Sequence, residues 1–91
     1  MFNSEAKTIH VLGRDFECVY GIYNHKAFCA IINYGICCEL PRTDDTQMNT
    51  NAILKALENN PKSGYLPEDE MDVFEIAAEL SEQITKDIQT L

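Results

Sequence analysis

The last 24 residues of the chain, 68–91, separate apolar from acidic side chains in the pattern of an amphipathic helix. At about 100° per residue, one side of that helix carries Val73, Ile76, Ala77, Leu80, Ile84, Ile88 and Leu91. The opposite side carries, within roughly 80°, the acids Glu68, Asp72, Glu75, Glu79 and Glu82. We predict a helix over residues 67–91. Because such a helix has to bury its apolar side, the rest of the chain must provide an apolar surface.

Nearly all of the net charge of the chain lies on this helix. Residues 68–91 hold eight acids and one base, a net charge of −7 against −8 for the whole chain. We call Asp72, Glu75, Glu79 and Glu82 the acidic ridge. Like-charged neighbours cost roughly a few tenths of a kcal/mol per pair, and only Glu82 and Lys86 have the spacing of a favourable pair. The simplest interpretation is a solvated helix face. The single sign of the charge favours a binding face, because surfaces that only confer solubility usually mix both signs.

The apolar surface is predicted to be an antiparallel sheet over residues 7–40. Segments rich in β-branched and aromatic residues alternate with turn signals that contain Gly or Asn, and Pro41 ends the last segment. We expect strands at 7–12, 16–23, 27–33 and 36–40. Residues 1–6 show no period and are expected to be a loose or edge segment. The last two strands are apolar on both faces, so either helices cover one face and a partner or second copy the other, or the strands curl around each other.

A first helix is predicted over residues 44–60. Its candidate N-caps are Asp44, Asp45 and Thr50. Its expected buried stripe is Met48, Ala52, Ile53, Ala56 and Leu57. The run 59–61 is a stop signal, and Pro67 is expected to open the second helix. The predicted fold class is therefore α+β: a four-stranded antiparallel β-meander followed by two C-terminal helices packed on one face (ββββαα), in a single small domain spanning 1–91.

Charge and composition exclude several classes of function. The seven Lys and Arg residues are scattered, so direct binding to nucleic-acid phosphates is not expected. Residues 1–12 lack the apolar core of a signal peptide, and the longest apolar run, 27–40, is too short to span a bilayer as a helix. The four cysteines lie inside strand-like segments and do not frame loops, which indicates free thiols in a reducing cytoplasm.

Neither a metal site nor a catalytic centre is expected. The chain has no CxxC motif, and the adjacent Cys37 and Cys38 would point to opposite faces of a strand. A zinc site would require Cys18, Cys29 and one of that pair to converge with a histidine by coincidence of the fold, whereas buried thiols usually act as small apolar residues. The candidate general bases are His10 and His25, and no nucleophile motif accompanies them. We predict no cofactor and no enzymatic activity.

We therefore expect a small inhibitor or adaptor. Glu68 and the acidic ridge would occupy a basic site on a partner protein, with a nucleic-acid-handling enzyme as the favoured class. The candidate hot spots beside the acids are Tyr23, Tyr34 and Tyr65. The helix carries roughly one charge per 5 Å and duplex DNA one per about 1.7 Å, so imitation of a duplex would need further acids or a dimer. In size and charge only, the chain resembles bacteriocin immunity proteins and phage-encoded inhibitors of host defence enzymes, and no residue role is carried over from those families.

The alternative is a self-associating structural module. In that case residues 27–40 would pair or stack with a second copy, giving a homodimer through the sheet, and the acids would serve only solubility.

Overall fold

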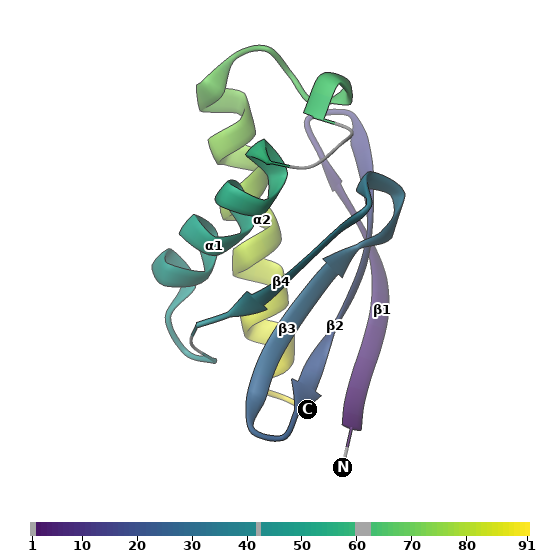
Figure 1. Ribbon diagram of the computed structural model, residues 1–91, viewed down its shortest axis with the longest axis vertical. Helices are drawn as coiled ribbons and strands as arrows, with labels where there is room; N and C mark the ends of the chain where they lie inside the picture. Colours follow the sequence, from purple (N-terminus) through teal and green to yellow (C-terminus); the bar gives the residue numbers. More distant parts are fainter. Residues whose placement is uncertain (1, 42, 60–62) are drawn as a thin grey trace.

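A four-stranded sheet with two helices on one of its faces makes up the fold (Figure 1). The computed structural model describes residues 2–41, 43–59 and 63–91. The strands are β1 (Phe2–Val11), β2 (Arg14–Tyr23), β3 (Lys26–Ile31) and β4 (Ile36–Leu40). The helices are α1 (Thr46–Glu58) and α2 (Glu70–Ile88), with short 3₁₀ turns η1 (Ile32–Tyr34) and η2 (Ser63–Tyr65). The predicted α+β class, with the element order ββββαα, is confirmed.

The strands form a meander in the order β1-β2-β3-β4, each antiparallel to the next. Two-residue turns join the first three strands, at Leu12-Gly13 and Asn24-His25, and all four residues have positive φ. This is the turn type whose twist matches that of paired strands. The first turn was expected at 13–15. It lies one residue earlier because β1 and β2 pair over their full ten residues, which also draws residues 2–6 into the edge strand β1.

One face of the sheet is buried under the helices. Its buried side chains are Ile9, Val11, Phe16, Cys18, Tyr20, Ala27, Cys29, Ile31, Ile36 and Leu40. From α2, Val73, Ile76, Ala77, Leu80, Ile84 and Ile88 are buried in the same core. The predicted apolar side of α2 is thus the buried one, except for Leu91, which follows the helix and is half-buried. The opposite face of the sheet, which we call the outer face, has neither helix over it (Figure 1).

The helix α1 runs antiparallel to α2 and contacts it through polar as well as apolar groups. The buried Asn49 side chain donates a hydrogen bond to Thr85 Oγ1 over 3.0 Å, and Ser81 Oγ donates to the Thr46 carbonyl over 2.7 Å. The expectation that Met48 is buried was wrong, because its side chain is 45% exposed. The buried arc of α1 is instead centred on Ile53, Leu57 and the polar Asn49 and Thr50.

Both helices begin at an aspartate N-cap. The Asp45 side chain accepts from Met48 N, and the Asp69 side chain accepts from Met71 N, so each carboxylate satisfies an orphan N–H of the first turn. Asp45 was among the expected caps. The expectation that Pro67 opens α2 was wrong, since α2 starts three residues later and Glu68 precedes it. Residues 60 and 61 of the expected stop signal lie outside the described part of the chain.

Hydrogen bonds to the sheet hold the C-terminal end of α2. The carboxylate of Asp87 accepts from the buried Tyr20 hydroxyl over 2.7 Å and from Lys7 Nζ over 3.3 Å. The hydrogen bond from Tyr20, followed by that from Lys7, lowers the pKa of Asp87 below its usual value. This anchor and the apolar packing fix the rotation of α2, and therefore the direction in which its acids point.

Candidate functional site

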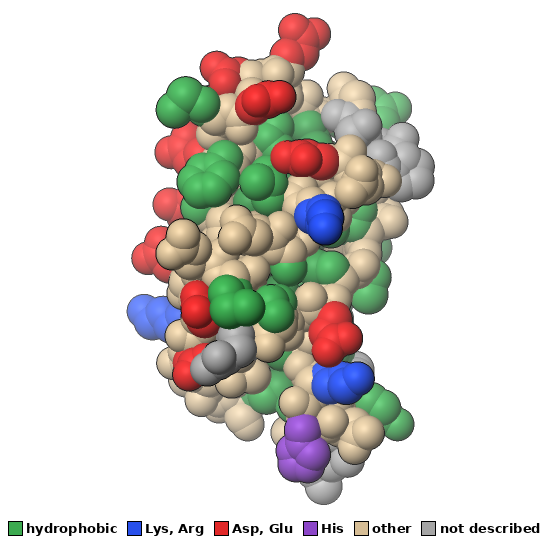
Figure 2. Space-filling model, turned by 60° about the vertical axis from the view of Figure 1, so that its left-hand side comes forward, with side chains coloured by type: hydrophobic (Ala, Val, Ile, Leu, Met, Phe, Trp, Pro, Cys, Tyr) green, Lys and Arg blue, Asp and Glu red, His purple; other side chains and the backbone are tan. Residues whose placement is uncertain are grey.

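The acidic ridge lies on the solvent side of α2. Glu75, Glu79 and Glu82 are exposed and Asp72 is half-buried. Figure 2 shows acidic side chains gathered along one edge of the molecule. Within the described residues, the two ion pairs are Lys7–Asp87 and His10–Asp15, and neither involves the ridge. The ridge is therefore a row of carboxylates whose charge is not neutralised by a described Lys or Arg within ion-pair distance.

An open hollow of about 470 Å³ lies between the end of α1 and the start of α2. Its lining is half apolar and half acidic: Leu54, Val73 and Phe74, with Glu58, Glu68 and Glu70. We call it the helix-end hollow. Phe74 is 50% exposed and the nearby Met71 is 80% exposed. Large apolar side chains are thus exposed directly beside the acids.

This hollow was not predicted from the sequence, although a signal for it was present. In the helical projection, Phe74 and Met71 fall between the apolar side of α2 and the acidic ridge. Large apolar residues outside the buried stripe of a helix are candidates for contact with another molecule. The contribution of α1, through Leu54 and Glu58, depends on how the two helices pack and could not be read from spacing.

The predicted hot-spot tyrosines are not brought together. Tyr65 is 73% exposed in η2, and its carbonyl accepts a hydrogen bond from Arg14 Nε over 3.4 Å. Tyr23 is 59% exposed at the end of β2 on the outer face, away from α2. Tyr34 is not a surface residue: it is 7% exposed and stacks on the core residue Phe16 with ring centroids 4.9 Å apart. It is therefore excluded as a hot spot.

The thiols and imidazoles are dispersed. Burial raises the pKa of Cys18 to about 12 and that of Cys38 to about 11, so these thiols stay protonated at neutral pH. His10 contacts Asp15 on the exposed surface, and His25 lies in the turn between β2 and β3. No group of three or more His, Cys, Asp or Glu that could hold a metal ion is found among the described residues. Neither α1 nor α2, as described, is long and apolar enough to cross a membrane.

Comparison with known proteins gives a family match over about the first two thirds of the chain. The model of one family matches residues 3–65. The chain belongs to DUF6618, a family of unknown function. The segment that matches DUF6618 contains nearly all of the sheet, α1 and η2, and it ends before α2 and the acidic ridge. No curated protein and no solved structure matches the chain.

Proposed function

We propose that this member of DUF6618 is a protein-binding inhibitor or adaptor, which uses the acidic ridge and the helix-end hollow to occupy a basic site on a partner. The observation that carries the proposal is the exposure of Phe74 and Met71 beside a row of carboxylates without described ion-pair partners. Specific interfaces combine an apolar centre with a polar rim, and this part of the surface offers both. On this proposal the protein acts by stoichiometric binding and has no catalytic role.

The chemistry of the hollow suits a lysine or arginine side chain of the partner. Such a side chain carries an apolar stem and a cationic head. The stem would lie against Leu54 and Val73, and the head would lie near Glu58 or Glu70 and over the ring of Phe74. A cation over an aromatic ring contributes roughly 0.5–1 kcal/mol at an exposed site.

The ridge extends this contact along α2. Asp72 and Glu82 are ten residues apart, which corresponds to about 15 Å of helix. Four carboxylates over that length can face several cations of a basic surface, such as the nucleic-acid site of an enzyme. They remain more widely spaced than duplex phosphates, so the fit is to a basic site in general and does not require mimicry of DNA. We include in this proposal an anti-defence or immunity-protein-like role, in which the partner is the enzyme that is inhibited.

The proposal includes a cytoplasmic location. All four cysteines are free, although Cys29 and Cys38 are direct cross-strand partners. Cysteines that lie inside strands and serve as small core residues suit a reducing compartment.

The test is capture of a partner by tagged protein with matched variants. The ridge pair, Glu75→Gln with Glu79→Gln, removes two charges from α2. The control pair, Glu5→Gln with Glu17→Gln, removes two exposed charges from the sheet. A partner held by the parent and the control pair, and released by the ridge pair, is the expected result. Equal capture by all three proteins would contradict the proposal.

A second variant tests the hollow separately from the charge. Phe74→Ala removes a half-exposed ring and leaves every carboxylate in place. We expect binding of the captured partner to weaken at least tenfold, with an unchanged circular dichroism spectrum. Unchanged affinity would limit the binding face to the ridge.

A further inference from the structure

The outer face of the sheet is a second surface with the composition of an interface. Across the strands, Val19 pairs with Ala30 and Ala30 with Cys37, while Gly21 pairs with Phe28. These side chains share one face and are small or apolar. Tyr23 is 59% exposed at the end of the same face. Antiparallel sheets that face water usually carry polar residues there, so this face favours a covered state.

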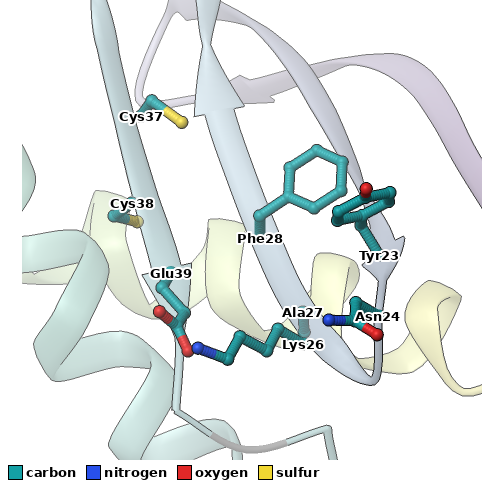
Figure 3. Close-up of a pocket in the computed structure, with 8 residues that line it drawn as sticks. All are labelled: Tyr23, Asn24, Lys26, Ala27, Phe28, Cys37, Cys38 and Glu39. Atoms are coloured by element: carbon teal, nitrogen blue, oxygen red, sulfur yellow. The ribbon is translucent and has the colours of Figure 1, made fainter. Parts of the chain in front are cut away.

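The outer face also contains both a projection and a recess. A hollow of about 470 Å³ lies over β3 and β4, with Tyr23 and Phe28 on one side and Cys37 and Glu39 on the other (Figure 3). The exposed ring of Tyr23 stands beside this hollow. An interface between two identical copies must be complementary to itself. A projecting ring beside a recess on one patch gives the outer face a way to meet that condition.

Charge disfavours one arrangement of two copies and is compatible with another. Each chain carries a net charge of −8, so copies associate only where their acidic ridges stay apart. Side-by-side pairing of the β1 edges would bring the two α2 helices together, because α2 packs on β1 and β2. Stacking of the outer faces puts two sheets and two helix layers between the ridges, a separation of about 30 Å. That exceeds three Debye lengths at about 0.15 M salt, so the repulsion is largely screened.

Over β3 and β4 the outer face carries little net charge, and the exposed acids of that face on β2, Asp15 and Glu17, lie toward its other end. Lys26 and Glu39 both line the hollow, and in Figure 3 the Lys26 side chain points toward Glu39. Across a two-fold axis, the same two residues can also face the opposite charge on the second copy. The centre of the contact is therefore apolar, and its margin at Lys26 and Glu39 is balanced.

We propose that a second copy of this chain packs on the outer face and forms a two-fold homodimer. Four strands at about 4.8 Å spacing and six residues at about 3.4 Å each give a projected area of about 400 Å² per copy. Two copies would together bury about 800 Å², less than the roughly 1,200 Å² at which stable specific interfaces begin, so we expect a weak dimer that forms only in the upper micromolar range. The proposal is independent of the partner bound by α2, since the two surfaces lie on opposite sides of the molecule.

Sedimentation equilibrium of the full chain between about 1 and 200 µM tests the proposal. The mass of the parent is expected to rise from that of the 10.3 kDa monomer toward twice that value. Tyr23→Glu places a charge at an exposed position and should weaken the dimer at least tenfold, as should Ala30→Lys at the centre of the face. The ridge pair should dimerise as the parent does.

Thermal melting of each variant separates loss of the interface from loss of the fold. A parent that stays monomeric at about 200 µM would overturn the proposal, whether or not another protein covers the face. A dimer that both substitutions leave intact would overturn it too, because the contact would then lie elsewhere. If the variant with Glu75→Gln and Glu79→Gln captures no partner but still dimerises, partner binding and dimerisation use different surfaces.

Discussion

The acidic ridge is expected to lower the stability of the protein that carries it. The perturbation that shows this is the ridge pair, Glu75→Gln with Glu79→Gln. Both residues are exposed, and neither takes part in an ion pair between described residues. Both also lie beyond the first turn of α2, where a negative charge would be favoured by the helix dipole. The two substitutions therefore remove repulsion without removing an identified favourable contact.

The magnitude follows from the spacing of the acids along α2. Glu75 lies three residues after Asp72 and four before Glu79, and Glu79 lies three before Glu82. Three like-charge neighbour pairs are therefore relieved, at roughly 0.2–0.5 kcal/mol each. We expect the free energy of unfolding to rise by about 1 kcal/mol. For a domain of this size, that raises Tm by roughly 4–8 °C.

Thermal melting followed by circular dichroism at low and high salt measures the effect. At about 1 M salt the Debye length is about 3 Å, shorter than the roughly 5–6 Å between neighbouring Cβ atoms, so the gain should shrink strongly. A ridge pair that melts at or below the Tm of the parent at low salt would refute the reasoning. It would mean that the carboxylates stabilise the fold, and the ridge would then have a structural role.

Two further substitutions test the hydrogen bond that holds α2 in place, and a third tests the close approach of β1 and β2. Tyr20→Phe removes the hydroxyl that donates to Asp87, and we expect urea titration to show a loss of about 1–2 kcal/mol. The pKa of Asp87 is lower in the folded protein than the unfolded value of 3.8, so its carboxylate stabilises the fold above that pH, and this stability is lost as the pH falls below it. With Asp87→Asn, the free energy of unfolding should therefore fall less steeply at acid pH. Equally steep acid limbs in parent and variant would contradict this. Gly21→Ala would place a Cβ against the β1 backbone, so we expect Tm to fall. An unchanged Tm would show that β1 can move aside at no cost in stability.

The sheet and α2 were predictable because burial there follows a simple period. Phe16, Cys18 and Tyr20 alternate with exposed or half-buried residues along β2, and the apolar positions of α2 recur at helical spacing. The N-cap Asp45 was predictable for a local reason, since a short acidic side chain reaches the N–H groups of the first turn.

Features that depend on tertiary packing could not be predicted from the sequence. The interior position of Asn49 exists because Thr85, 36 residues away, accepts its hydrogen bond. Tyr34 is of a residue type common at binding hot spots, and its burial against Phe16 is visible only in the fold. The helix-end hollow likewise requires Leu54 of α1 and Phe74 of α2 to lie on its two sides, an arrangement set by how the helices pack.

The most direct test of the binding role is the salt dependence of affinity for the captured partner, measured with the parent, the ridge pair and the control pair. We predict that the affinity of the parent falls steeply between about 0.05 and 0.5 M salt, and that the ridge pair binds weakly throughout. The control pair should follow the parent. Equal affinity of all three proteins, or no change with salt, would contradict a binding role for the acidic ridge and leave it as the solvated face of α2.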